Sequence, residues 1–340
     1  MAIAVAVAAV AVAAMVTQAG ARREQAAGQA TAAAAGPRCF GAAARDPNRP
    51  CVDARFKFTV TPSPADALIT PNAPCLPRTT DDAIFHALGA SAGSLLYFHE
   101  CVFATQPPLA LSGTALVGDS HAETWRAALD VVGTTLKWEG ASITRSSCPF
   151  TDAPPLLPQA IAAQCVRWRQ LVVAWFDANP QVSTAFVAQH ATATVIPARG
   201  KSTYATQLAG YLAAWRSLPA TVKHIVVLRD TPQASASLTA GCVQAAVDRR
   251  RPPGLACALP RARSLPRDPA VDAAARLGPR ASVIDLTRFF CDRTLCYPVI
   301  GGVLVYKDGE HMTRLFSQTL GPYLRHEVGK LLAAWAAGSS

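Results

Sequence analysis

Short apolar segments with strand character alternate with segments of helical length from about residue 110 onwards, and this alternation constrains the fold more than any other feature. Strands are expected at 115–117, 135–143, 184–192, 224–229 and 282–286, and helices at 122–132, 160–178, 203–217 and 313–337, the last interrupted at Gly321-Pro322. Such a pattern predicts a parallel sheet with helices on both faces. We therefore predict a three-layer α/β/α sandwich around a five-stranded parallel sheet. No internal repeat is visible.

The first of these strands leads into a serine. Residues 114–125 read as a short buried strand, a tight Gly118-Asp119 turn and a helix that begins at Ser120. Parallel sheets bind ligands at the carboxyl ends of their strands, and the positive end of a helix dipole suits a nucleophile there. These residues support a structural alternative equally well, because Ser120 to Glu123 has the S-x-x-E pattern of a capping box.

A base for this serine is offered near the other end of the chain. Asp308-Gly-Glu-His311 lies between the apolar run 301–306 and the last helix. An Asp and a His three positions apart can share one face, so that the carboxylate fixes the imidazole tautomer. A serine nucleophile needs such an oriented base. Ser120, His311 and Asp308 are the expected catalytic set.

Three other polar residues are expected on the same edge of the sheet. His190 lies near the end of the third strand, where it can touch a substrate, although a packed or hydrogen-bonded role is favoured. Asp230 follows the fourth strand, and a capping role is favoured there over substrate contact. His121, beside Ser120, is a further candidate for contact with the substrate or leaving group.

The ten cysteines indicate a disulfide framework. Their number is even and no C-x-x-C pair occurs, so a zinc cluster is not expected, and no metal or cofactor is predicted. Five disulfides would indicate an oxidising, extracytoplasmic compartment. The sequence does not determine the connectivity, and the simplest hypothesis pairs sequential neighbours: Cys39–Cys51, Cys75–Cys101, Cys148–Cys165, Cys242–Cys257 and Cys291–Cys296.

The N-terminal segment agrees with that compartment. Residues 2–16 form an apolar run that is followed by small residues, as in a signal peptide, but no basic residue precedes the run and Arg22-Arg23 follow it. The run can instead be a membrane anchor, or the end of the last membrane helix of a longer protein. We assign 1–21 to a signal peptide or anchor that contacts the membrane, and 22–38 to a flexible linker.

The remaining residues are divided at 108. A Cys- and Pro-rich extension, 39–108, is expected to pack on the main domain, 109–330, and to contain a strand at 56–60. The net charge of +10 does not indicate a nucleic-acid partner, because only 16% of residues are charged and the basic ones are scattered. The dense run Arg249-Arg250-Arg251 reads as a solvated loop, with a surface for anionic envelope polymers as the alternative.

Gly118-Asp-Ser-His121, followed far along the chain by Asp308-x-x-His311, resembles the SGNH (GDSL-like) hydrolase superfamily. The similarity is closer to the extracytoplasmic SGNH domain at the C-terminus of membrane-bound acyltransferase family 3 proteins, which O-acetylate cell-surface polysaccharides. In that branch the first and last motifs resemble 116–122 and 301–313, and other similar segments are 39–43, 147–149 with Cys165, 229–232 and the Cys291/Cys296 pair. The resemblance covers 39–326 and implies an SGNH, flavodoxin-like fold.

The resemblance also implies roles for single residues. Ser120 would be the nucleophile, His311 the general base and Asp308 its orienting partner, with one oxyanion donor at the Ser120 backbone N–H and with Gly118 and Asp119 beside it. The superfamily takes further donors from a glycine after the second strand and an asparagine after the third. This chain departs from that pattern at both places: Arg-Ser-Ser-Cys, 145–148, follows its second strand, and Gln189-His190 follows its third. A backbone N–H near Ser147 is the candidate replacement.

The implied activity is transfer of an acyl group, favoured to be acetyl, through an acyl-enzyme on Ser120 to an envelope glycan or polysaccharide. The acyl group would come from a membrane acyltransferase family 3 partner domain. If water accepts the acyl group the protein is an esterase, and the sequence does not separate these outcomes. A non-catalytic glycan-binding SGNH module is the remaining alternative, against which the complete Ser, Asp and His set argues.

Overall fold

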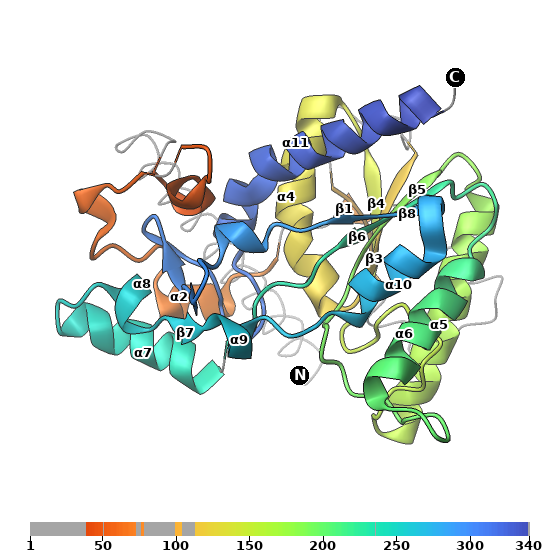
Figure 1. Ribbon diagram of the computed structural model, residues 1–340, viewed down its shortest axis with the longest axis horizontal. Helices are drawn as coiled ribbons and strands as arrows, with labels where there is room; N and C mark the ends of the chain where they lie inside the picture. The colour runs from red at the N-terminus through yellow and green to blue at the C-terminus, as the bar shows by residue number, and fades with distance from the viewer. Residues whose placement is uncertain are drawn as a thin grey trace, which may run out of the picture. The chain divides into compact units, whose positions relative to one another are not determined.

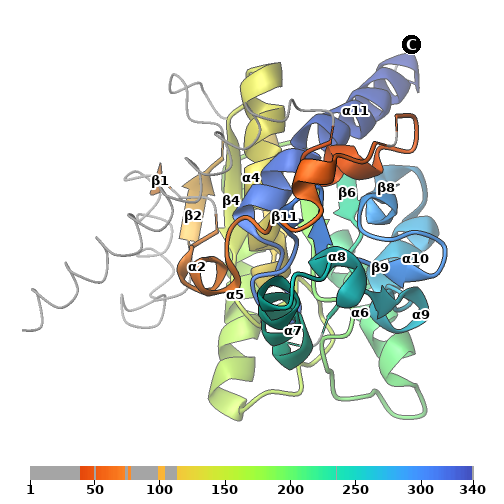
Figure 2. The same cartoon turned by 90° about the vertical axis from the view of Figure 1, so that its left-hand side faces the viewer.

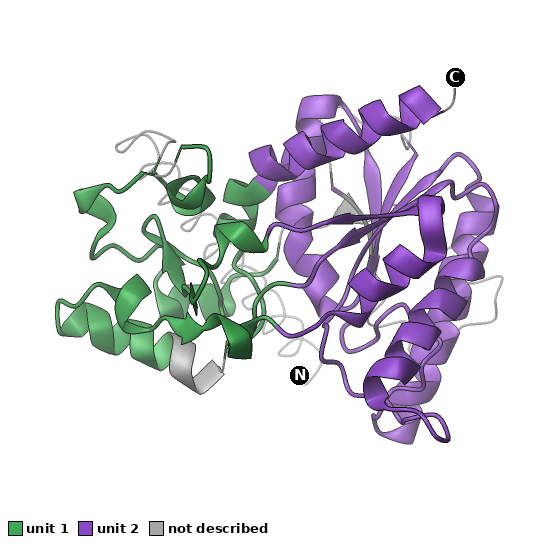
Figure 3. Ribbon diagram, in the orientation of Figure 1, with its two compact units in different colours: residues 1–74, 231–265, 287–320 green, residues 75–230, 266–286, 321–340 purple. Residues whose placement is uncertain are grey.

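The computed structural model describes residues 39–49, 51–72, 76–77, 99–103, 113–234 and 236–338. The chain forms two compact units (Figure 3). Unit 1 combines 1–74, 231–265 and 287–320, and unit 2 combines 75–230, 266–286 and 321–340. The predicted segments 1–21 and 22–38 and the boundary at 108 lie outside the described residues, so these divisions remain predictions.

Unit 2 is built on a parallel sheet. Its parallel strands are β3 (Thr114–Gly118), β4 (Gly140–Thr144), β5 (Thr184–Ala188), β6 (His224–Leu228) and β8 (Ala281–Ile284), in the order β4-β3-β5-β6-β8. Short strands β1 (Leu76–Pro77) and β2 (His99–Val102) add an antiparallel edge beside β4. The five-stranded parallel sheet is confirmed, and its strand order is flavodoxin-like, with a topological switch point between β3 and β5.

Helices cover both faces of this sheet (Figures 1 and 2). Helices α5 (Gln159–Ala178), α6 (Thr203–Arg216) and α10 (Pro269–Leu277) pack on one face around a core that includes Trp168, Trp175 and Trp215. Helix α4 (Ser120–Leu136) lies on the other face, where the Arg126 side chain donates to Ser142 and Thr144 of β4. Helix α11 (Arg314–Gly338) packs on α4 where Gly321 approaches Val131.

Several predicted bounds were wrong. Thr135 and Leu136 belong to α4, which ends at Lys137 in the left-handed conformation (φ 57°), so β4 begins only at Gly140. Helix α11 continues through Pro322, so the interruption predicted at Gly321-Pro322 is wrong. Helices α7 (Ala236–Asp248) and α10 were not predicted.

The strand expected at 56–60 is also wrong. A 3₁₀ turn, η2 (Ala54–Phe56), occupies its start because the Asp53 side chain accepts the Arg55 N–H and caps the turn. Phe56 is buried against Gly302 rather than alternating with exposed residues along a strand. Only Thr61, just beyond the predicted segment, bridges to a strand residue, Val303.

Unit 1 is assembled from short elements. Its buried residues include a cluster of Ala67, Val243, Ala246, Val299 and Leu304, and the aromatic side chains of Phe289, Phe290 and Phe316. Its hairpin pairs β10 (Val299–Ile300) with β11 (Val303–Leu304), and β7 (Leu259–Pro260) pairs with β9 (Leu295–Cys296). Its other elements are η1 (Gly41–Arg45), η2, α2 (Pro64–Ile69), α7, α8 (Pro253–Ala256), α9 (Arg261–Ser264), η5 (Thr287–Phe289) and the start of α11; η4 (Gly278–Arg280) lies in unit 2.

Four of the predicted disulfides are confirmed: Cys39–Cys51, Cys242–Cys257 and Cys291–Cys296 in unit 1, and Cys148–Cys165 in unit 2. The fifth predicted pair, Cys75–Cys101, includes a residue outside the described part of the chain. None of the helices in the described ranges is both long and apolar enough to span a bilayer.

Candidate active site

The turn that carries Ser120 leaves β3 through a residue that has to be glycine. Gly118 has φ 154°, and a Cβ there would lie 1.8 Å from the Ala188 carbonyl oxygen of β5. Asp119 is the N-cap of α4, because its Oδ1 accepts the His121 backbone N–H at 2.9 Å. The alternative interpretation, a capping box with Ser120 as the N-cap, is therefore wrong. Ser120 is the first residue of the helix and is half-buried.

Asp119 joins two loops of unit 2. Its Oδ2 accepts the backbone N–H of His190, the second residue after β5, at 2.9 Å. Burial raises the pKa of Asp119, and the charge of His121 and the two backbone N–H donors offset that rise only in part. The carboxylate fixes the start of α4 against the end of β5, which is the switch point of the sheet.

His121 and Asp230 form a buried pair. The His121 Nδ1 lies 2.6 Å from the Asp230 Oδ1, and each side chain is 3% exposed. The other oxygen of Asp230 accepts the Ala191 N–H at 2.8 Å. Burial alone would raise the pKa of Asp230, but the charge of His121, its hydrogen bond and the Ala191 N–H lower it below its usual value. The carboxylate caps no described helix.

His190 stacks on this pair. Its ring lies 4.4 Å from that of His121, at an interplanar angle of 12°, and its Nε2 is 3.0 Å from the Thr192 Oγ1. His190 is half-buried and Thr192 is exposed, so His190 is the more accessible of the two imidazoles. The loops after β3, β5 and β6 thus meet around His121.

The loop after β4 also lies at this end of the sheet. The Arg145 N–H donates to the Gly118 carbonyl at 3.0 Å, and the Cys148 N–H closes a turn on the Arg145 carbonyl. Within that turn Ser147 is exposed and has φ 64°, a left-handed conformation that costs energy for a residue with a side chain. The Cys148–Cys165 disulfide ties the turn to α5.

The Asp308–His311 pair lies in unit 1, whereas Ser120 lies in unit 2. The Asp308 Oδ2 is 2.8 Å from the His311 Nδ1, and its Oδ1 accepts the backbone N–H groups of His311 and Glu310 at 2.7 and 2.9 Å. Burial acts to raise the pKa of Asp308, but these hydrogen bonds lower it to about 2. The carboxylate is ionised at neutral pH and binds Nδ1, which leaves Nε2 as the basic nitrogen.

Comparison with known proteins identifies the family. A family model described as "SGNH domain (fused to AT3 domains)" matches residues 79–326. The chain belongs to this family. The periplasmic domain of a lipopolysaccharide acetyltransferase from Salmonella ser. Paratyphi A is a similar solved structure, with 12% identity, a TM-score of 0.47, and coverage of 64% of this chain and 84% of that chain. No curated protein matches.

Membership places this SGNH domain among acyl-transfer and ester-hydrolysing enzymes at a coarse level, in a family whose members are fused to AT3 domains. The four disulfides among the described residues are typical of an oxidising compartment outside the cytoplasm.

Two further polar residues of this SGNH domain were not among the predicted site residues: Gln189, named only as a departure from the superfamily pattern, and Asp268. Gln189, 3% exposed, follows β5 where the superfamily has its asparagine region, and its Oε1 accepts the Phe150 N–H at 2.6 Å. Asp268 caps α10 and accepts the Asp230 N–H at 3.1 Å. Burial and the charge of Asp230 raise the pKa of Asp268 to about 6. The Asp268-Pro269 pair is a helix-start signal that could have located the second residue.

Proposed function

We propose that this SGNH domain transfers an acyl group to a hydroxyl of a cell-envelope glycan through an acyl-enzyme on Ser120. The favoured acyl group is acetyl. The observation that carries this proposal is the Asp308–His311 hydrogen bond of 2.8 Å, which orients an imidazole for base catalysis. A second observation supports it: Ser120 is the first residue of α4, at the positive end of the helix dipole.

In the first half-reaction the His311 Nε2 takes the Ser120 hydroxyl proton while Oγ attacks the acyl carbonyl carbon. The tetrahedral intermediate collapses when the leaving group departs with the proton held by His311, and an acyl ester on Ser120 remains. In the second half-reaction His311 takes a proton from the glycan hydroxyl, whose oxygen attacks the acyl ester. The proton then returns to the Ser120 oxygen, which restores the enzyme.

The oxyanion of each tetrahedral intermediate needs at least two donors. We assign one to the Ser120 backbone N–H at the start of α4, where the helix dipole is positive. The second is the backbone N–H at Ser147, in the strained turn that hydrogen-bonds to Gly118. Asp119 and Gly118 hold these two backbone segments rather than contact the substrate.

His190 is proposed as the residue that contacts the acceptor, since it is half-buried and follows the strand next to β3. His121 and Asp230 act through it. Their pair is almost entirely buried, so they orient the stacked His190 ring and hold the Ser120 turn. They are positioning residues in this proposal.

The acyl donor and the location of the protein belong to the same proposal. An AT3 membrane domain would supply the acyl group, either on a separate chain or on the same one. The segment 1–21 would attach the domain to the membrane or direct its export. The SGNH domain, 109–330, would then act outside the cytoplasm on envelope polysaccharide, with 39–108 packed on it.

The test uses the oxidised protein with p-nitrophenyl acetate and then with acetyl-labelled donor and envelope polysaccharide. Turnover is expected for the unmodified protein and is expected to fall to background for Ser120→Ala. Label on the polysaccharide would indicate a transferase, and label in free acetate would indicate an esterase. The esterase follows the same steps with water as the acceptor. Turnover of the unmodified protein no higher than that of Ser120→Ala would refute a serine mechanism. Background turnover in both proteins would leave a non-catalytic glycan-binding module.

A further inference from the structure

The positive charge of the protein is concentrated in unit 1. The sequence of unit 1 has sixteen Lys and Arg against eight Asp and Glu, and that of unit 2 has sixteen against fourteen, so unit 1 carries +8 of the net +10. An excess of this kind attracts anionic ligands.

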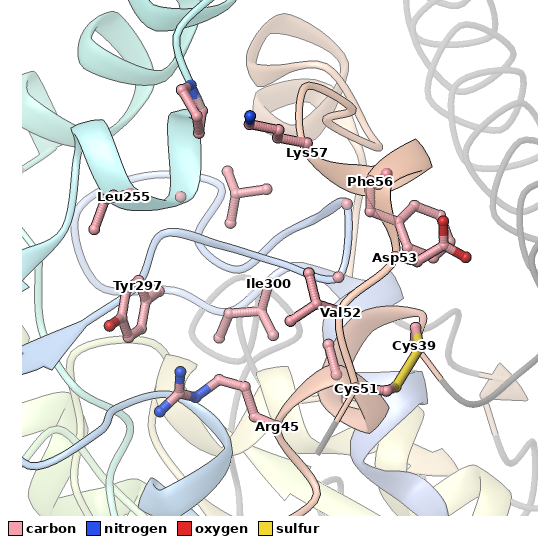
Figure 4. Close-up of a pocket in the computed structure, with 17 residues that line it drawn as sticks. Cys39, Arg45, Cys51, Val52, Asp53, Phe56, Lys57, Leu255, Tyr297 and Ile300 are labelled. Carbon is pink, nitrogen blue, oxygen red and sulfur yellow. A yellow bond between two sulfur atoms is a disulfide. The ribbon is translucent and has the colours of Figure 1, made fainter. Parts of the chain in front are cut away.

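Unit 1 also contains a cavity of about 750 Å³, which lies entirely within that unit. Its walls are mainly apolar, and Val52, Leu255, Ile300 and Tyr297 surround the same space in Figure 4. Val52 is 99% exposed and Leu255 is 65% exposed. A volume of this size is in the range that binds small molecules, and exposed aliphatic side chains at a concave surface indicate an apolar ligand.

Two cationic side chains border the apolar walls. In Figure 4 the Lys57 ammonium and the Arg45 guanidinium lie on opposite sides of Val52 and Ile300. Arg45 stacks on the Tyr297 ring, with its Cζ 4.6 Å from the ring centroid. Asp53 is the one acidic residue among the described lining residues, and it is paired with Arg55 at 2.7 Å, so its charge is balanced.

The basic run 249–251 leads directly into the pocket wall. Arg249, Arg250 and Arg251 are exposed, and the next residue, Pro252, lines the pocket together with Leu255 of the same short segment. The sequence had suggested a solvated loop or a surface for anionic polymers. Its connection to an apolar cavity favours instead a ligand with an anionic group and a hydrocarbon part.

We propose that this pocket binds a single-chain lipid, with the hydrocarbon chain against Val52, Leu255 and Ile300 and an anionic head group at the Lys57 ammonium. A free sugar would fit poorly, because the walls offer few polar partners to its hydroxyls. The proposal goes beyond the acyl transfer assigned to Ser120 and does not depend on it.

The test measures binding of cis-parinaric acid, a fluorescent single-chain carboxylate, to the full-length, disulfide-bonded protein. Saturable binding is expected, and Leu255→Glu is expected to weaken it about tenfold or more, since it places a charge among the apolar contacts. Leu156→Glu is the matched control, because Leu156 is 59% exposed and lies outside the pocket in unit 2. Both variants change exposed residues, and thermal unfolding verifies that they fold.

The charge is tested separately. Lys57→Gln is expected to weaken binding of cis-parinaric acid severalfold and to leave binding of its neutral methyl ester unchanged. The control is Lys201→Gln, because Lys201 is an exposed lysine of unit 2, and it is expected to change neither affinity. Absence of saturable binding, or equal weakening by Leu255→Glu and Leu156→Glu, would overturn the proposal. Binding to phosphatidylglycerol vesicles without binding of parinaric acid would also overturn it, because the charge would then serve a membrane surface.

Discussion

Gly118 controls where the nucleophile points, because it sets the direction in which the chain leaves β3. Replacing it with alanine brings a Cβ to 1.8 Å from the Ala188 carbonyl, at φ 154°. We expect Gly118→Ala to lower the melting temperature by several degrees and to remove ester turnover. Gly200→Ala is the control, since Gly200 has φ 72° but open space around it. Equal losses in both variants would attribute the effect to φ alone.

Asp308 is the second residue whose role can be tested alone. Asp308→Asn keeps the size of the side chain but removes the charge that holds the His311 tautomer, so we expect the ester turnover number to fall about 10³- to 10⁴-fold. The KM is expected to change little. A fall in turnover of less than tenfold would show that His311 does not depend on this carboxylate.

The same residue predicts a stability effect at acid pH. Its pKa is depressed from 3.8 to about 2 in the folded protein, so it stabilises the fold above its unfolded pKa, and that contribution is lost as the pH falls through about 2. Urea unfolding of the unmodified protein and of Asp308→Asn is expected to differ most above pH 4 and to converge towards pH 2. A constant difference across that range would contradict the depressed pKa.

At the scale of elements, the regular strands could be predicted and the polar loops could not. Periodicity located all five parallel strands, because apolar β-branched runs such as 224–228 have few alternatives in a buried sheet. The same reasoning extended a strand into the end of α4, since it could not foresee that Lys137 adopts a left-handed conformation. Boundaries of this kind depend on tertiary contacts rather than on local pattern.

In the candidate site, too, local motifs could be predicted from the sequence and long-range contacts could not. Ser120, Asp308 and His311 could be named because they belong to short local motifs whose resemblance to a known family is visible. The pairing of His121 with Asp230 was not predicted, since the two residues are 109 positions apart and meet only through the strand order β3-β5-β6. Their separate treatment as a substrate contact and a cap followed from reading each loop alone.

Helix α10 provides a prediction about pH. Asp268, its N-cap, has a pKa raised to about 6, so between about pH 4 and 6 the folded protein binds a proton that the unfolded chain releases. Stability is therefore lost as the pH rises through this window, by on the order of 2 to 3 kcal/mol. Asp268→Asn keeps a capping side chain and is expected to remove this pH dependence in urea titrations. An unchanged slope would exclude Asp268 as its source.

The turn after β4 is tested through its disulfide. Replacing Cys148 and Cys165 together with serine is expected to cost about 2 to 4 kcal/mol. If Ser147 supplies an oxyanion donor, the turnover number for p-nitrophenyl acetate should also fall, since the turn loses its link to α5. The comparison is the variant in which Cys291 and Cys296 are both replaced with serine. Their disulfide closes a loop in unit 1. Normal turnover in the folded Cys148 variant would argue against the Ser147 assignment.

At the scale of the whole molecule, the two units rely on different sources of stability. Unit 1 has three of the four described disulfides, whereas unit 2 has one of them and a core with three buried tryptophans. We expect dithiothreitol to accelerate hydrogen exchange in 39–74, 231–265 and 287–320 well before the strands of unit 2 respond. Uniform acceleration across both units would show that they unfold together.

The four described disulfides all join cysteines that are next to one another in sequence, separated by 12, 17, 15 and 5 positions. A chain that crosses a membrane in an extended form therefore presents the two partners of each bond almost together, before the next cysteine arrives. An oxidase that acts on thiols in their order of emergence would make these native bonds directly. Maturation of these four links would then require no reshuffling by an isomerase.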